Sequence, residues 1–214
     1  MHVSEIWRYP VKSMRGQRVT QAEVLRTGLV GDRSIVVISR ATGRFITSRT
    51  HPGLLGLSGA VQDDGSITIN GKPWNSAEAH QLVDEATKEH VDLEDLGSST
   101  ERFDILPLLV ATDGAISALG IDSRRIRPNI IVAGVAGLAE REWPGHSLRL
   151  GTVEIEAVQL RARCVMTTYD PDTLVQDRNV LFRIVSEMGG KLALDCAVRQ
   201  PGFLRENDPV ELVS

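Results

Sequence analysis

The sequence predicts a mainly β protein with a few helices, an α+β fold, and three observations lead to this prediction. Short runs rich in Val and Ile alternate with Gly and Asp turns over residues 1–70, which is typical of an all-β barrel or sandwich. Later in the chain, a few stretches have apolar residues at helical spacing, and further strand-like runs follow them. The chain has 214 residues, 42% hydrophobic and 24% charged, which suits one large or two small globular domains.

Two hairpins are expected in the N-terminal part. Residues 31–50 hold two strand-like runs joined by "ATGR", in which Gly43 can adopt a positive φ. Residues 58–71 repeat the pattern with "DDG" as the turn.

The middle of the chain changes character. Residues 75–96 have apolar residues at helical spacing, and Asn75 is the candidate N-cap of a helix there. The charged and polar segment 94–104, "EDLGSSTERFD", resembles a surface linker between two halves. A compact helix is then predicted from its cap Thr112 to its terminator Gly120.

In the last third of the chain, the sequence predicts further strands and one more helix. In "VEIEAVQLRARC" the apolar alternation changes phase between residues 157 and 158, which predicts a β-bulge or bend just before Cys164. Residues 208–213 read as a final strand. An amphipathic helix is predicted over 177–188, and its apolar face is formed by Val180, Leu181, Ile184, Val185 and Met188.

Composition excludes several function classes. The formal charge of −4 provides no general attraction for a polyanion, and 4% aromatic residues offer few stacking platforms, so no nucleic-acid partner is expected. No run approaches the ~20 apolar residues of a membrane span, and the N-terminus lacks the apolar core of a signal peptide. With only two cysteines and no framework spacing, we expect a cytoplasmic protein with reduced thiols.

Cys164 is the first candidate for chemistry. Its thiolate would be a soft metal ligand and a good nucleophile, and a neighbouring Arg would lower its pKa. In a regular strand, however, Arg161 and Arg163 would point to the opposite face, so only a bend or strand end brings Arg163 beside the thiol. From the residues alone, packing in the core is favoured over reactivity for Cys164, and also for Cys196 in its apolar setting.

Dispersed basic residues form the second candidate group. Lys12 and Ser13 follow a proline in "YPVKS", and Arg33 lies in "GDR". The run 124–129, "RRIRPN", adds three more arginines and Asn129. Such groups suit a phosphate or another anion, although a solvated edge explains the run equally well. In "YDPDT" (169–173), the two aspartates are expected to form a structural turn.

These stretches, taken together and in order, resemble one family. The chain resembles the MOSC proteins, which include relatives of the molybdenum cofactor sulfurase C-terminal domain and of the mitochondrial amidoxime-reducing component. The similar stretches are "IWRYPVKSMRG", "GLVGDRSIVVIS", "RPNIIV", "RCVMTTYDPDT" and the late "NDPVEL". The resemblance implies a MOSC-type β-barrel packed with a smaller N-terminal β-barrel-like domain. It places the N-terminal domain at residues 1–95 and the MOSC domain at 96–214.

The resemblance also implies a molybdenum cofactor, that is, molybdenum bound to a molybdopterin. Cys164 matches the residue that ligates the metal and would be the catalytic residue. The positions that match cofactor-binding residues, or are further candidates for that role, are Lys12, Ser13, Arg33, Arg127, Asn129, Arg163 and Asp113. Ile105, Leu106 and Ala162 depart from the pattern, since relatives of the amidoxime-reducing type have hydroxyl residues there.

The activity implied by the resemblance is the reduction of N-hydroxylated small molecules. Electrons would come from separate ferredoxin- or flavoprotein-type proteins, because two cysteines do not provide for an iron–sulfur domain. Two alternatives stay open: sulfur transfer through a persulfide on Cys164, and a non-catalytic carrier of the cofactor. The sequence does not indicate the physiological substrate or the oligomeric state.

Overall fold

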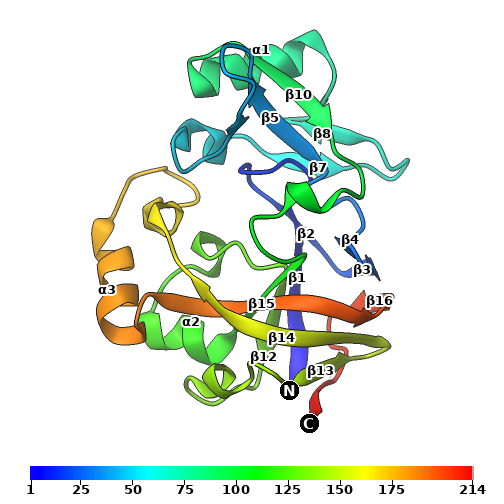
Figure 1. Cartoon of the computed structure of the whole chain (residues 1–214), viewed down its shortest axis with the longest axis vertical. Helices are drawn as coiled ribbons and strands as arrows, with labels where there is room; N and C mark the ends of the chain where they lie inside the picture. Colours follow the sequence, from blue (N-terminus) through cyan, green and yellow to red (C-terminus); the bar gives the residue numbers. More distant parts are fainter. Residues whose placement is uncertain (214) are drawn as a thin grey trace.

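An eight-stranded sheet dominates the computed structural model, which describes residues 1–213 (Figure 1). Its strand order is β17-β13-β14-β15-β11-β12-β1-β2, and every neighbouring pair is antiparallel except β11 and β12. The bounds of these strands are β1 His2–Arg8, β2 Gln17–Val19, β11 Leu108–Thr112, β12 Ile130–Ala133, β13 Ser147–Leu150, β14 Val153–Ala162, β15 Lys191–Gln200 and β17 Val210–Val213. The mainly β prediction with a few helices is confirmed, although within residues 1–213 no strand pair closes this sheet into a barrel.

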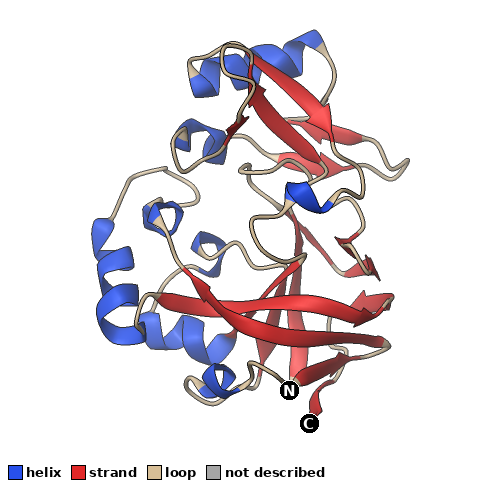
Figure 2. Cartoon of the chain, in the orientation of Figure 1, coloured by secondary structure: helices blue, strands red, loops and turns tan. Residues whose placement is uncertain are grey.

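Three small sheets complete the strands (Figure 2). Each has three strands, in the orders β10-β5-β6, β16-β3-β4 and β7-β8-β9. Their bounds are β3 Gln21–Leu25, β4 Gly28–Leu29, β5 Ile35–Ser39, β6 Phe45–Ile46, β7 Gly59–Val61, β8 Ile67–Ile69, β9 Lys72–Pro73, β10 Val91–Asp95 and β16 Gly202–Arg205. The expected hairpins are β5–β6 and β7–β8, and their turns hold Gly43 at φ 67° and Gly65 at φ 84°.

Strand pairing does not follow a simple division of the chain. β1 and β2, near the N-terminus, lie in the large sheet, and β16, near the C-terminus, pairs with β3. A second apolar core forms away from the large sheet, where α1 (Ala77–Thr87) packs its Ala79 and Val83 against Ile35 of β5. The boundary after residue 95 stays a prediction.

Helix α1 differs from its expected form. Ser76, not Asn75, is its N-cap, because the Ser76 hydroxyl accepts a hydrogen bond from the Ala79 N–H at 3.2 Å. The helix ends at Thr87, where Lys88 adopts the left-handed conformation, and residues 91–95 form β10 instead of a further helical turn. The β-branched Val91 is fully buried against β5, and this burial decides the state of the segment.

The segment 94–104 is not the solvated linker that its composition predicts. Arg102, in the short 3₁₀ helix η2 (Thr100–Arg102), is 4% exposed and donates to the carbonyl oxygens of Gly97 and Thr27. The guanidinium also lies over the Phe103 ring, 4.7 Å from its centre. These contacts fasten the segment to the body of the protein.

The prediction for α2 (Asp113–Leu119) is confirmed at both ends. The Thr112 side chain accepts from the Ala115 N–H, and Gly120 ends the helix in the left-handed conformation at φ 59°. Because α2 connects the parallel strands β11 and β12, it forms the crossover that a parallel pair requires.

Helix α3 (Arg178–Met188) also forms, capped by Asp177 and ended by Gly189. Its buried face is narrower than predicted, because Val185 is 56% exposed whereas Ile184 is fully buried. Adjacent residues on a helix are ~100° apart, so only one of these two side chains can point at the core.

The predicted bulge in β14 is confirmed. The register between β14 and β15 shifts between Ala157 and Gln159, and again between Leu160 and Ala162. β14 then ends at Ala162, and Cys164 is the N-cap residue of the 3₁₀ helix η5 (Val165–Thr168). Because the strand ends there, the side chains of Arg163 and Cys164 need not point to opposite faces of the sheet.

The face of α3 can be tested with two neighbouring substitutions. We expect Ile184→Ala to lower the free energy of unfolding by about 2–5 kcal/mol, because it leaves a cavity in the core. Val185→Ala should change it by no more than about 0.5 kcal/mol, because that side chain is largely in solvent. Urea denaturation of both variants measures the difference, and equal losses would contradict the assigned face.

Candidate functional site

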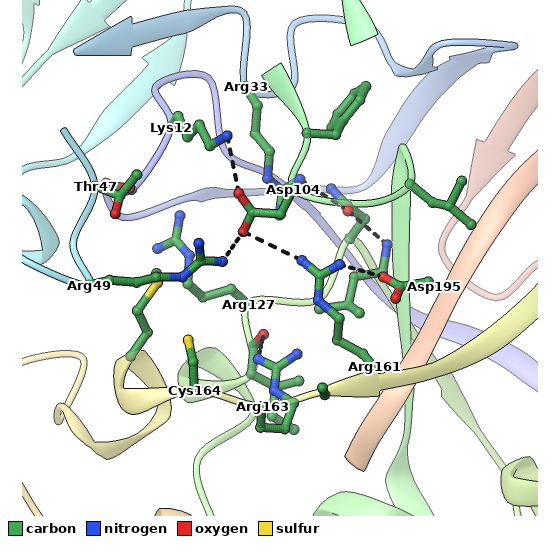
Figure 3. Close-up of a pocket in the computed structure, with 18 residues that line it drawn as sticks. Lys12, Arg33, Thr47, Arg49, Asp104, Arg127, Arg161, Arg163, Cys164 and Asp195 are labelled. Atoms are coloured by element: carbon green, nitrogen blue, oxygen red, sulfur yellow. Dashed lines mark hydrogen bonds and ion pairs between the residues drawn. The ribbon is translucent and has the colours of Figure 1, made fainter. Parts of the chain in front are cut away.

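A cavity lies where the turns of the N-terminal half face the end of β14 (Figure 3). Its walls come from the turn after β1, the loops before β5 and after β6, the segment before β11, the turn before β12, and the end of β14. The lining residues are Lys12, Ser13, Arg33, Thr47, Arg49, Phe103, Asp104, Leu106, Leu109, Ile126, Arg127, Asn129, Arg161, Ala162, Arg163, Cys164, Met166 and Asp195. Six of them are basic and two are carboxylates, so the cavity suits an anion.

The structure brings together all but one of the eight residues that the resemblance assigns to the metal or the cofactor. Seven of them line this cavity: Lys12, Ser13, Arg33, Arg127, Asn129, Arg163 and Cys164. Asp113 does not line it. Its carboxylate instead accepts from the N–H groups of Gly134 at 2.8 Å and Val135 at 3.0 Å, which ties the start of α2 to the loop after β12. We therefore leave Asp113 out of the candidate site.

Three cavity residues have an unusual backbone conformation. Ser13, Arg33 and Arg127 have φ values of 74°, 53° and 60°, in the left-handed region that residues other than glycine rarely adopt. Each such residue costs roughly 1–2 kcal/mol, and it persists only where the surrounding structure enforces it. Three strained residues from three separate segments converge on one cavity, and this is common at functional sites.

Buried hydrogen bonds hold Arg33 and Asn129 in place. Asp32 is fully buried, accepts from the Tyr9 N–H at 2.8 Å and pairs with the Arg33 guanidinium. The same guanidinium donates to Asn129 Oδ1 at 3.2 Å. Asn129 is also fully buried; its Oδ1 accepts from the Leu109 N–H and its Nδ2 donates to a carbonyl of β1. This network joins β1, β11 and the turn before β12 behind the cavity.

Two arginines have unsatisfied hydrogen-bonding capacity. The Arg127 guanidinium stacks on the Tyr9 ring at 4.4 Å, and no hydrogen bond or ion pair ties it to another group within residues 1–213. Arg163 donates to the Ile126 carbonyl at 2.6 Å, but its buried Nε has no partner in that part of the chain. Burial lowers the pKa of each to about 10. The buried Arg163 Nε is costly without an acceptor, and the half-buried Arg127 guanidinium lines the cavity, so both residues favour an anionic or hydrogen-bond-accepting ligand.

Sequence reasoning missed Arg49, Arg161 and Asp104 as site residues. Asp104 Oδ1 lies 3.2 Å from Lys12 Nζ, while its Oδ2 pairs with Arg49 and lies 3.5 Å from Arg161 Nη2. Burial would raise the pKa of Asp104, but Lys12 and Arg49 outweigh it and hold that pKa below its usual value. No local motif marks these residues, because they come from a loop, a strand end and an apparent linker.

Asp195 of β15 lines the cavity and pairs with Arg161. Its side chain is 2% exposed and accepts from Arg161 Nη1 at 2.8 Å and from Gln159 Nε2 at 3.1 Å. Burial raises the pKa of Asp195, and the charge of Arg161 only partly offsets that effect. Arg161 is therefore shared between two carboxylates.

Cys164 lines the cavity and is half-buried, whereas Cys196 is fully buried in the main core. The Arg49 guanidinium lies beside the Cys164 sulfur, although it comes from the loop after β6 (Figure 3). The Cys164 carbonyl accepts from both the N–H and the hydroxyl of Thr167, at 3.1 and 2.9 Å. The expected packing role of Cys196 is confirmed, and burial raises the pKa of its thiol.

The acidic turn after Cys164 has a structural role, as predicted. Asp170 accepts from the Thr173 N–H at 2.9 Å and pairs with Arg125 at 2.9 Å. Asp172 pairs with Arg124 at 2.7 Å. Arg124 and Arg125 therefore do not face the anion cavity, and the two pairs tie the turn to the 3₁₀ helix η3 (Ser123–Arg125), two residues before Arg127.

Two features are absent from residues 1–213. No three His, Cys, Asp or Glu side chains are grouped so that they could hold a metal ion by themselves. No helix there is both long and apolar enough to cross a membrane.

Comparison with known families assigns both halves of the chain. The family described as MOSC domain matches residues 100–211, and the MOSC N-terminal beta barrel domain matches residues 1–104. The chain belongs to the MOSC family. In this MOSC protein, the two matched regions meet at residues 100–104, the segment that carries Asp104 into the cavity.

Curated relatives and a solved structure agree with this assignment. The MOSC protein is 28% identical to mitochondrial amidoxime reducing component 2 of Homo sapiens over 97% of this chain and 82% of the relative. It is 25% identical to mitochondrial amidoxime-reducing component 1 of Mus musculus over 99% of this chain and 82% of the relative. The crystal structure of the YuaD protein from Bacillus subtilis shares the fold, with a TM-score of 0.54 at 12% identity over 99% of this chain and 94% of that one.

The positions that depart from the amidoxime-reducing pattern differ in their placement. Leu106 and Ala162 line the cavity, whereas the Ile105 side chain is 50% exposed and is not part of the lining. Leu106 and Ala162 therefore contribute apolar surface to the cavity and no side-chain hydrogen-bond donor.

Thiol labelling can test the contrast between the two cysteines. We expect a small alkylating reagent to modify Cys164 in the folded protein and to leave Cys196 unmodified, because only Cys164 lines a cavity. Peptide mass spectrometry locates the modification. Labelling in denaturant is the control and should modify both thiols; labelling of Cys196 in the folded chain would contradict its placement.

Proposed function

We propose that this MOSC protein binds a molybdenum cofactor in the cavity and reduces N-hydroxylated small molecules, with Cys164 as the molybdenum ligand. The observation that carries the proposal is the placement of the Cys164 thiol in a cavity with six basic side chains. The names of the curated relatives, amidoxime-reducing components, support the choice of substrate class.

The residues present fit such a cofactor. A thiolate is a soft ligand that suits a transition metal, and Cys164 is accessible from the cavity. The buried Arg163 Nε is a donor without an acceptor, as expected where a ligand supplies the acceptor, and the Arg127 guanidinium lines the same cavity. Lys12, Ser13, Arg33 and Asn129 would join them in holding the phosphate and the pterin.

When bound, the cofactor would supply the electron and oxygen-atom chemistry, and the protein supplies binding, orientation and electrostatics. Thr167 holds the Cys164 carbonyl and so orients the thiol-bearing residue. The Arg49 guanidinium lies beside the sulfur, where it would partly offset the negative charge of a metal-bound thiolate. The basic side chains would offset the negative charge of a phosphate. They would do so in place of a P-loop, because residues 1–213 contain no P-loop sequence.

The proposal includes partners and location. Electrons would reach the site from separate ferredoxin- or flavoprotein-type proteins. We also propose that the protein works in the cytoplasm, as its thiol content suggests.

The metal and pterin content of natively purified protein tests this function. We expect molybdenum and pterin in a near 1:1 ratio to the chain from a host that makes the cofactor. Cys164→Ala should lose most of the molybdenum, because the only proposed protein ligand is gone. Cys196→Ala is the matched control and should retain it, because that thiol is buried in the core.

The same samples distinguish the two alternatives. Protein without molybdenum, but with an added sulfur on Cys164 in the mass spectrum, would favour sulfur transfer. Stoichiometric cofactor without turnover of N-hydroxylated substrates by any electron donor would favour a cofactor carrier. Metal-free protein with no persulfide would overturn the proposed chemistry of Cys164 altogether.

A further inference from the structure

One carboxylate lies among three of the cavity's cations. Asp104 Oδ1 forms an ion pair with Lys12 at 3.2 Å, and Asp104 Oδ2 forms ion pairs with Arg49 and Arg161. These cations come from the turn after β1, the loop after β6 and the end of β14, and Figure 3 shows all three pointing at Asp104. Both carboxylate oxygens are therefore occupied by positive charge.

The three cations depend on Asp104 to different degrees. Arg161 has a second carboxylate partner, Asp195 at 2.8 Å. Within residues 1–213, Asp104 is the only carboxylate paired with Lys12 and with Arg49. Removing the Asp104 charge would leave both of them without a counter-charge in a partly buried cavity, where like charges repel strongly.

Asp104 is placed so that its side chain can move without the backbone. It lies between η2 and β11, and Arg102 fastens the preceding residues to the carbonyl of Thr27 at 2.6 Å. The Asp104 side chain is 30% exposed, and its polar contacts are with the three cations. Exchanging such partly exposed ion pairs for another anion changes the free energy only modestly.

We propose that Asp104 competes with bound ligands for an oxyanion site formed by Lys12, Arg49 and Arg161, and thereby sets a threshold that a group with two negative charges exceeds and a monoanion does not. A monoanion that displaces Asp104 replaces one negative charge by another and gains little. A phosphate monoester dianion brings a second charge and a third oxygen for the same three cations. The inference deepens the proposed function, because it names the residue that decides which anionic group the cavity accepts.

Anion titration of the full chain, prepared from a host that cannot make the cofactor, tests this inference. Inorganic phosphate at pH 8 is the dianionic probe and acetate is the monoanionic probe, both followed by calorimetry. We expect Asp104→Asn to bind phosphate about tenfold more tightly than the unsubstituted chain, because one competing ion-paired group is lost. We also expect acetate, which gains too little to displace Asp104 in the unsubstituted chain, to bind measurably to Asp104→Asn, because no ion-paired carboxylate then has to be displaced.

Asp172→Asn is the matched control. This substitution makes the same change in net charge as Asp104→Asn. The Asp172 side chain, however, is 64% exposed and pairs with Arg124 outside the cavity. The affinity for phosphate should therefore change by less than about twofold. Equal or weaker phosphate binding by Asp104→Asn would overturn the inference and make Asp104 a scaffold for the cations. Absence of phosphate binding by both proteins would also overturn it.

A second variant keeps the test decisive if Asp104→Asn does not fold. Arg49→Gln removes one of the three cations and should weaken phosphate binding at least about fivefold, since charge-assisted bonds are the strong ones. Unchanged affinity would rule out the oxyanion site. Because the titration uses cofactor-free chain, its outcome is independent of the molybdenum measurement, and the two proposals fail separately.

Discussion

Repulsion between like charges is the constraint on which this structure depends. The chain is acidic overall, at −4, yet six basic side chains line one cavity. Their charges are tolerated because Asp32, Asp104 and Asp195 each pair with at least one of them. The lowered pKa of Arg127 and of Arg163 shows that burial still makes their charge costly. A ligand that carries negative charge would relieve this cost, which links the electrostatics of the protein to its proposed function.

The fold delivers these charges from distant parts of the sequence. β1 leads into the turn that holds Lys12 and Ser13, and its pairing with β12 places the Arg127 turn alongside. The bulged end of β14 adds Arg161, Arg163 and Cys164 from a third direction. The acidic turn after Cys164 is bound to η3 by two arginine–aspartate pairs, so the thiol and Arg127 are held by one connected segment. Left-handed backbone at Ser13, Arg33 and Arg127 is the local cost of this convergence.

Local patterns predicted much of the secondary structure, and their failures have tertiary causes. The hairpins, α2 and the β14 bulge follow from turn residues, caps and alternation, which depend on near neighbours alone. The start of α1 was placed one residue too early because both Asn75 and Ser76 are good caps, and only the hydrogen bond to Ala79 distinguishes them. The segment 94–104 looked solvated because it is charged, but Arg102 finds two carbonyl partners that its neighbours in sequence do not reveal. Val185 looked like a core residue for a similar reason, since composition cannot tell which edge of an apolar stripe faces a partner.

The sequence by itself determined the candidate residues of the site. Short, continuous motifs, through their resemblance to the MOSC proteins, mark Cys164, Lys12, Ser13, Arg33, Arg127, Asn129 and Arg163. Only the tertiary structure decided which of them share a cavity, and it removed Asp113, whose carboxylate caps two backbone N–H groups elsewhere. Only the tertiary structure revealed Arg49, Arg161 and Asp104, whose electrostatic coupling acts through space between segments far apart in the chain. The strength of a Coulomb interaction depends on the distance between the charges and on their burial, and local sequence specifies neither.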